Sequence, residues 1–196
     1  MAKKKKSVTD TAVTQSNIPV VGNVVIKRLG SNGKVKSCMR VNNTATFNLL
    51  QGLGYHLIGN SNLGGGIFPK YLSVGYNSGP SVKTSPTMTT LYNEFDIPRF
   101  KLNYSNVQLK QVVENDVPIP QVEVLFSTVI PYQSVAAYTT GFNELGLYSD
   151  FSGNTLLARV ETDRSGDLAP LGAIKAVPGD NLLIEWYIIL KVGGVK

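Results

Sequence analysis

The chain has 196 residues, 42% of them hydrophobic, with 19 basic against 13 acidic residues. The hydrophobic fraction is large enough for a folded core and excludes a wholly disordered chain. A single cysteine, Cys38, excludes an internal disulfide and a two-cysteine metal motif, and a single histidine, His56, excludes a histidine-rich metal site. No apolar run reaches the roughly 18 residues that span a membrane, and no apolar region of a secretory signal follows the basic start.

The net charge of +6 is unevenly distributed along the chain. Residues 1–41 contain nine basic residues and one acidic residue, a net +8, whereas residues 42–196 contain ten and twelve, a net −2. We expect residues 1–19 to form a basic polar arm that carries Lys3, Lys4, Lys5 and Lys6, and residues 20–196 to form one domain. Such an arm is either a solvated tail or a segment that docks on a partner chain or on nucleic acid.

The first half of the domain predicts three strands and one helix. Residues 20–29 and 35–41 form a basic hairpin, and the absence of interleaved aromatic residues argues against binding of single-stranded nucleic acid. Residues 44–57 are the only predicted helix, because apolar residues recur there at helical spacing: Phe47, Leu50, Leu53 and Leu57. Residues 71–75 predict a short strand, and a region rich in turns follows it.

Two carboxylates, Glu94 and Asp96, lie close together in an otherwise neutral region. We interpret them structurally, as a Glu94–Arg99 ion pair or a loop cap, because no neighbouring element is available to raise the pKa of either one for acid–base work. Residues 99–113 and 122–130 then predict two long strands, joined by a connection over residues 114–120.

Residues 142–160 predict a hairpin around Gly153 and Asn154. A two-residue loop there would place Leu147 opposite Val160 and would gather one apolar face. That face, which we expect in the core, holds Leu145, Leu147, Leu156, Ala158 and Val160. The opposite face is polar, and we expect it to make contacts between subunits; it holds Glu144, Tyr148, Asp150, Arg159 and Glu161.

Residues 181–192 predict a final strand that is apolar on both faces. One face holds alternate large apolar residues, and the other includes Leu183, Tyr187 and Ile189, so the strand is either central or faces another subunit. About eight strands, one short helix and many glycine and proline turns predict a mainly β fold. We expect an antiparallel β-sandwich that is jelly-roll-like.

The residues present do not form a pattern typical of an enzyme. The lone histidine has no nucleophile partner in a recognisable motif, no metal-binding spacing is present, and nothing pairs two of the carboxylates as a glycosidase requires. We therefore expect no catalytic residues, no metal, no cofactor and no small-molecule substrate.

Several segments in a fixed order nevertheless carry a resemblance. They are residues 43–50 (NTATFNLL), 69–75 (PKYLSVG), 84–87 (TSPT), 90–94 (TLYNE) with Arg99, 142–148 (FNELGLY), 156–159 (LLAR) and 182–186 (LLIEW). Together they resemble small bacteriophage virion proteins of the tail, collar, fibre-adaptor and capsid-decoration kind. The basic arm and the first hairpin lie outside this resemblance.

The resemblance implies a non-enzymatic virion protein, made in the host cytoplasm and present in several copies through symmetric self-association. It implies contacts with itself and with other virion proteins at the neck, tail or baseplate. Capsid decoration is the alternative position, with the lysines of the arm gripping the shell or facing packaged nucleic acid. A carbohydrate-binding β-sandwich is an alternative of another class, with tyrosines as stacking platforms: Tyr71, Tyr76, Tyr92 or Tyr104. As assembly contacts we single out the lysines of the arm with Glu144, Tyr148, Arg159, Tyr187 and Ile189.

Overall fold

The computed structural model describes residues 20–57, 68–78, 87–114, 116–162 and 173–191. The lysines predicted to form the basic arm, Lys3–Lys6, and residues 84–86 of the TSPT segment lie outside the described residues. Neither helix in the described part of the chain has the length and apolar character needed to cross a lipid bilayer.

The described residues form nine strands and two short helices. In chain order they are β1 (Val20–Leu29), β2 (Val35–Ala45), α1 (Phe47–Leu57), β3 (Tyr71–Gly75), β4 (Phe100–Lys101), β5 (Asn103–Glu114), β6 (Val117–Pro131), α3 (Tyr132–Val135), β7 (Glu144–Tyr148), β8 (Leu156–Glu161) and β9 (Asn181–Lys191).

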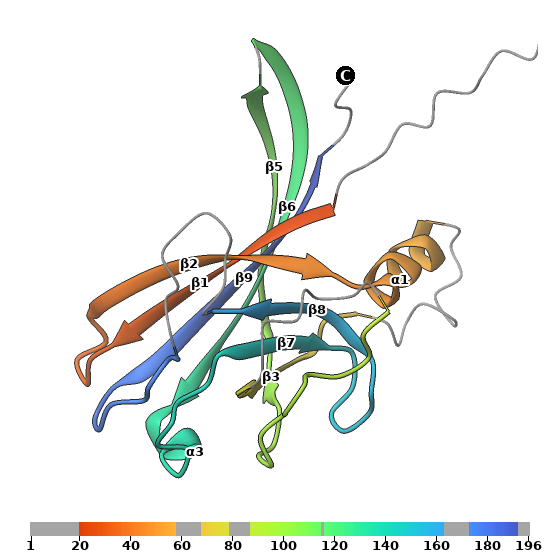
Figure 1. Ribbon diagram of the computed structural model, residues 1–196. Helices are drawn as coiled ribbons and strands as arrows, with labels where there is room; N and C mark the ends of the chain where they lie inside the picture. Colours follow the sequence, from red (N-terminus) through yellow and green to blue (C-terminus); the bar gives the residue numbers. More distant parts are fainter. Residues whose placement is uncertain (1–19, 58–67, 79–86, 115, 163–172, 192–196) are drawn as a thin grey trace, which may run out of the picture.

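Two antiparallel sheets pack face to face (Figure 1). The five-stranded sheet has the order β2-β1-β9-β6-β5, and the four-stranded sheet has the order β4-β3-β7-β8. The end of β2 joins the two sheets, because Thr44 and Ala45 pair with β8. The prediction of an antiparallel β-sandwich with a short helix is confirmed, whereas the single turn of α3 was not predicted.

The core lies between the two sheets. Strand β9 is central in its sheet, with β1 on one side and β6 on the other, which is the first of the two alternatives that its sequence left open. Its inward residues Leu182, Ile184, Trp186 and Ile188 are at most 5% exposed, and they face a layer that includes Leu72, Val74, Leu145 and Leu147 of the four-stranded sheet. Trp186, the only tryptophan, is fully buried.

The connection predicted over residues 114–120 is wrong, because β6 begins at Val117 and pairs with β5 almost to the turn. Asp116, at φ 63°, makes that turn in the left-handed region. Pro118 and Pro120 had suggested a loop. Proline is tolerated in a strand where one side lacks a neighbour, and among the described residues β6 pairs with β9 only from Gln121 onward.

Helix α1 is rotated relative to the predicted apolar stripe, and of that stripe Leu53 packs against the core whereas Phe47 and Leu50 do not. Leu49 is 3% exposed and Leu53 packs against the core, whereas Phe47 and Leu50 are 57% and 43% exposed. The helix is positioned by Thr46, whose hydroxyl donates to the carbonyl of Leu156 at 2.6 Å. This hydrogen bond to β8 sets the rotation of the helix about its axis. The spacing of apolar residues along the helix does not reveal such a distant contact.

The hairpin β7–β8 forms in a register two residues from the predicted one. Leu147 pairs with Ala158, not with Val160, and a register shift follows between Leu147 and Tyr148. A shift of two residues keeps Leu145, Leu147, Ala158 and Val160 on the core face, so that part of the prediction is confirmed. The irregularity moves Leu156 to the opposite face, where it packs with Tyr148, and Leu157 enters the main core.

Candidate functional site

A segment formed by residues 87–99, named here the covering segment, lies over the outward face of β7 and β8. The amide of Leu91 donates to the hydroxyl oxygen of Tyr148 at 2.9 Å, and the amides of Tyr92 and Asn93 donate to the carboxylate of Glu144 at 3.5 and 3.3 Å. Leu91 also packs with Tyr148 and Leu156 in a small apolar cluster. The four-stranded sheet is therefore covered on both faces.

The prediction that the polar face of this hairpin makes contacts between subunits is wrong for its central residues. Glu144, Tyr148 and Arg159 are at most 1% exposed. Their alternation with apolar residues indicated a solvent-facing side, but the covering segment removes that side from water. A partner chain does not reach these side chains unless the covering segment moves.

Arg159 and Glu144 form an ion pair with both side chains fully buried. The Nε of Arg159 donates to Oε1 of Glu144 at 2.8 Å, its Nη2 also bonds that oxygen, and Nη2 lies 3.3 Å from Oε2 of Glu161. Its guanidinium also lies 5.7 Å from the centre of the Tyr92 ring. Because removing one partner of such a pair leaves an uncompensated charge in the interior, we interpret this cluster as a device that holds the covering segment in place.

A second ion pair, between Glu94 and Arg99, fixes the far end of the covering segment, as the sequence predicted. Nε and Nη2 of Arg99 donate to the two oxygens of Glu94 at 2.7 and 2.9 Å, and Nη1 donates to the carbonyl of Gly153 at 2.7 Å. The guanidinium lies 3.5 Å from the centre of the Tyr148 ring. Arg99 thus joins the covering segment to the β7–β8 loop.

The surroundings of Glu94 and Arg99 favour the charged form of both side chains. Burial acts to raise the pKa of Glu94, but hydrogen bonds from Arg99 and from the hydroxyl of Ser73 outweigh it, and the net result is a lowered pKa. The pKa of Tyr148 is raised, first by burial and then by the nearby charge of Glu94. A lowered carboxyl pKa beside an arginine is typical of an ion pair that stabilises the fold, and it is the opposite of the raised pKa of a general acid.

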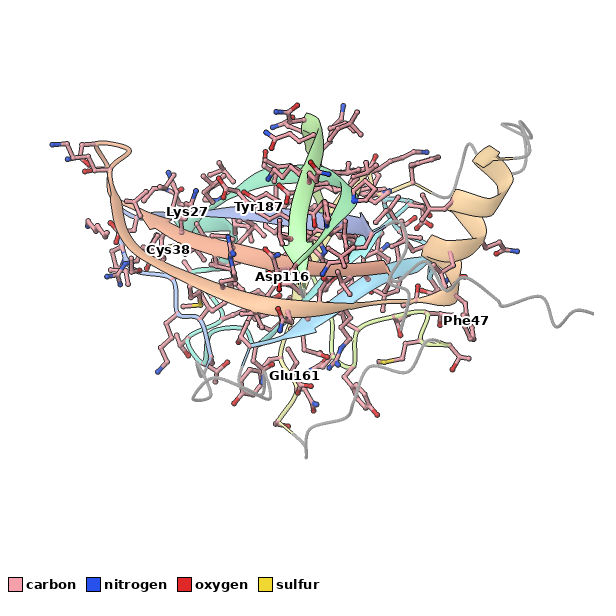
Figure 2. The ribbon with its side chains drawn as sticks, turned by 90° about the horizontal axis from the view of Figure 1, so that it is seen from above. Lys27, Cys38, Phe47, Asp116, Glu161 and Tyr187 are labelled. Carbon is pink, nitrogen blue, oxygen red and sulfur yellow. The ribbon has the colours of Figure 1, made fainter. Side chains whose placement is uncertain are left out.

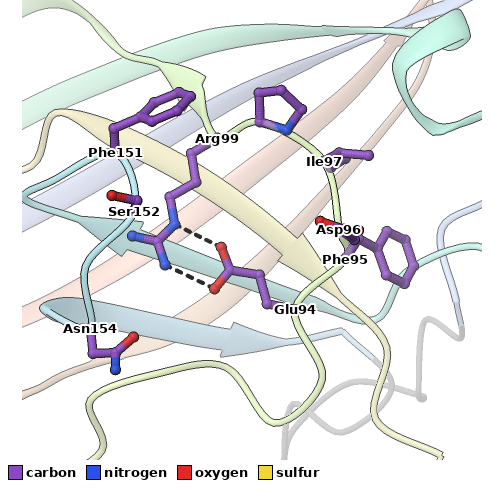
Figure 3. A pocket seen from close by; sticks show the side chains of 9 residues that line it. Glu94, Phe95, Asp96, Ile97, Arg99, Phe151, Ser152 and Asn154 are labelled. Atoms are coloured by element: carbon purple, nitrogen blue, oxygen red, sulfur yellow. Dashed lines mark hydrogen bonds and ion pairs between the residues drawn. The ribbon is translucent and has the colours of Figure 1, made fainter.

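A surface depression of about 450 Å³ opens beside the Glu94–Arg99 pair (Figure 3). It lies between the covering segment and the β7–β8 loop, which contributes Phe151, Ser152 and Asn154. Figure 3 shows Arg99 directed at Glu94, and the hydrogen bonds of its guanidinium end on Glu94 and on the loop. The depression therefore offers an exposed ring at Phe151 and small polar groups, and not a pair of groups set up for catalysis.

Within the described residues, the side chains that commonly bind metals are scattered. Among the residues that the structure describes, no three histidine, cysteine, aspartate or glutamate side chains form a group that could hold a metal ion. Cys38 is exposed on β2, and the side chain of His56 lies outside the described residues.

The tyrosines proposed as sugar platforms have different environments. Tyr71 packs against Phe151 with ring centres 5.6 Å apart, and Tyr76 is half-buried against the core. Tyr92 is 53% exposed, and the side chain of Tyr104 lies outside the described residues. Of the three tyrosines described, only Tyr92 presents most of its surface to a ligand.

Tyr187 and Ile189, the two remaining predicted contact residues, lie on the outward face of the five-stranded sheet (Figure 2 labels Tyr187 beside Lys27). Both are half-buried. Lys27 bonds Glu185 at 2.8 Å and Tyr187 donates to the same carboxylate at 3.3 Å, so the centre of this face is polar. A hydrogen bond from Lys27 to Glu185 is the main reason that the pKa of Lys27 is raised. Contact of these two residues with a partner stays a prediction.

Strands β5 and β6 form a surface that the sequence did not indicate. In Figure 1 their paired ends extend past the ends of the other strands. Val107, Leu109 and Val113 on β5 are 65%, 85% and 69% exposed. They lie on the same side of the sheet as the buried Phe126, but beyond the region that the four-stranded sheet covers. We call the exposed apolar side of this hairpin the ribbon face; it consists of Val107, Leu109, Val113, Pro118 and Pro120.

Comparisons with known proteins add no family to this description. No protein-family model matches the chain, and no match is found among curated proteins or among solved structures.

Proposed function

We propose that this chain is a non-enzymatic structural protein of a bacteriophage virion, which self-associates and bridges components at the neck, tail or baseplate. The observation that carries the assembly role is the ribbon face, where three large apolar side chains of one strand are more than 60% exposed. Apolar groups grouped in this way on a projecting hairpin favour contact with another protein surface.

The arrangement of the charged residues supports the same role. The buried carboxylate of Glu144 and the partly buried carboxylate of Glu94 are both used in ion pairs that fasten the covering segment. Ion pairs that hold the covering segment rigidly suit a building block, because its shape has to be the same in every copy. The position in a virion is supported by the ordered segments that resemble small phage virion proteins, several of which fall on β3, β7, β8 and β9.

Imaging of intact particles tests the position of the protein. Electron microscopy of particles whose copies of this chain carry a small added tag is expected to show density at the neck, tail or baseplate. Density over the whole head would instead indicate capsid decoration. If the tagged chain were absent from purified particles, a role in the virion would be contradicted. Sedimentation of the purified chain at high micromolar concentration tests the assembly role separately, and a chain that stays monomeric there contradicts self-association.

A further inference from the structure

Within the described part of the chain, the five-stranded sheet has two edges that are open along most of their length. Strand β2 pairs there with β8 only through Thr44 and Ala45, so residues 35–43 have β1 as their one described neighbour. Strand β5 pairs with β6 alone among the described residues. An open edge presents unpaired backbone N–H and C=O groups and attracts another strand unless the protein blocks it.

The β2 edge is blocked by charge. Lys34, Lys36 and Arg40 lie at or along it and are exposed, and Lys36 bonds Asp180 at 2.6 Å. A second strand laid against β2 would have to bury these charges or meet its own like charges. Charged side chains along an edge are a common protection against unwanted pairing.

The β5 edge lacks this protection. It contains no proline, and its one basic residue, Lys110, is already bonded to Glu123 at 2.6 Å. Its exposed side chains include Val107, Leu109 and Val113, two of them the β-branched type that packs well between strands. A strand twelve residues long, exposed and apolar on one side, is a template for a further strand.

We propose that β5 pairs antiparallel with β5 of a second copy of this chain, around a two-fold axis that passes through Gln108. This inference rests on the self-association in the proposed function and names the surface that carries it. The near-neutral edge favours a second copy over a charged partner, because Lys110 and Glu123 already neutralise each other. Pairing would make the two five-stranded sheets one continuous sheet and would bring the two ribbon faces side by side on the same side of it.

The position of the axis follows from the order of residues along β5. With the axis at Gln108, Val107 lies opposite Leu109 of the partner subunit, and Lys110 lies opposite Asn106 of the partner subunit. An axis at Lys110 would oppose two like charges, and an axis at Asn106 would oppose Leu109 to Asn103 of the partner subunit. The axis at Gln108 thus sets apolar against apolar without opposing like charges, and it pairs β5 over most of its length.

Substitutions on the two edges test the surface. Leu109→Lys and Val107→Lys are expected to weaken self-association on the order of a hundredfold in sedimentation velocity, since each substitution occurs twice in the dimer. Val35→Lys is the matched control, because Val35 is also an exposed valine, 55% exposed, at the start of the other open edge. Unchanged Trp186 fluorescence in each variant shows that the fold is kept.

A cysteine at the axis tests the register. Gln108→Cys in a Cys38→Ser background is expected to form a disulfide-linked dimer on mild oxidation, because facing residues of antiparallel strands lie at disulfide distance. The unmodified chain, whose Cys38 is exposed on β2, controls for random oxidation.

The outcomes separate the two proposals. If the unmodified chain self-associates but Leu109→Lys behaves like Val35→Lys, or if no disulfide forms at position 108, the β5 pairing is wrong and self-association through another surface stands. If the unmodified chain is monomeric, the β5 pairing and the proposed self-association are both wrong.

Discussion

Arg159 is a residue whose environment in the structure differs from the one that its sequence pattern predicts. In the strand pattern it occupies an outward position beside Glu144 and Tyr148, where a charge is normally solvated. In the folded chain its side chain is fully buried, and its guanidinium bonds two carboxylates, those of Glu144 and Glu161. The alternation of β7 and β8 identifies the two sides of the hairpin, but it does not reveal that a distant segment covers the second side.

Reversing the charge at this position is expected to destabilise the fold strongly. Arg159→Glu would place a third carboxylate beside Glu144 and Glu161 in a site closed to water, and we expect a loss of about 3–5 kcal/mol in the free energy of unfolding. The fluorescence of Trp186 during urea unfolding measures this loss, because Trp186 is the only tryptophan and is fully buried.

Arg40→Glu is the control for the same chemical change on the exposed face of β2, and we expect an effect within about 0.5 kcal/mol. Equal unfolding midpoints for the two variants would mean that the outward face of β7–β8 is open to water after all.

Glu94 gives a prediction about pH. Its pKa is lowered in the folded chain, so its ion pair with Arg99 stabilises the fold above the ordinary carboxyl value of 4.5 and loses that contribution as the pH falls through the lower, folded value. Glu94→Gln should therefore be less stable than the unmodified chain at neutral pH, and the difference should shrink in the acid range. Urea unfolding midpoints measured over a pH series test this.

Asp96→Asn serves as the comparison, since it removes a negative charge from an exposed position two residues along the same segment. A gap between Glu94→Gln and the unmodified chain that stays constant down to acid pH would show that the carboxylate charge contributes nothing to stability.

At the scale of the elements, the sequence predicts a helix or strand correctly where neighbouring residues determine it. It fails where a contact with a distant part of the chain determines it. The bounds of β1 and β3 follow from short runs rich in β-branched and apolar residues that are bounded by glycine and proline, and they were predicted to the residue. The rotation of α1 depends on Thr46 and its bond to Leu156, more than 100 residues away, and was predicted wrongly. Likewise, the Val-Pro-Ile-Pro stretch of β6 is a strand because β5 pairs with it, although its prolines suggest a loop.

The covering segment is seated closely on the end of β3, and Gly75 makes this possible. A β-carbon at Gly75 would lie 2.4 Å from the carbonyl oxygen of Asn93, which is backbone and cannot rotate away. Gly75→Ala is therefore expected to push the covering segment outward and to cost about 1–3 kcal/mol in the free energy of unfolding. Urea unfolding measures the cost, and faster proteolysis within residues 87–99 locates it.

Gly54→Ala is the matched substitution with the opposite expected sign. No atom lies within 4 Å of a β-carbon built at Gly54, which is exposed on α1, and alanine favours a helix by about 1 kcal/mol relative to glycine. A Gly75→Ala variant as stable as Gly54→Ala would mean that the covering segment adjusts without cost.

At the scale of the whole molecule, composition and pattern predicted the sandwich but not the surface by which we propose that it assembles. The fold class followed from strand number and turn residues, which are properties of the chain itself. The exposure of Leu109 follows from where the four-stranded sheet ends relative to β5 and β6, and this is a property of the packed pair of sheets. In the sequence, Val107, Leu109 and Val113 look like ordinary core residues of a strand.

The last prediction concerns the part of the chain that precedes the sandwich. Among the residues that the structure describes, the buried core runs from Val24 to Ile188, and we expect a chain that starts at residue 20 to unfold at the same urea concentration as the full chain. The truncated chain loses the four lysines of the predicted arm and one acid, Asp10, and its net charge falls from +6 to +3. Any binding of the full chain to a polyanion that weakens steeply with salt should therefore be lost on truncation without a change in stability. A lower unfolding midpoint for the truncated chain would instead place residues 1–19 against the body of the molecule, and their role would then belong to the fold and not to partner binding.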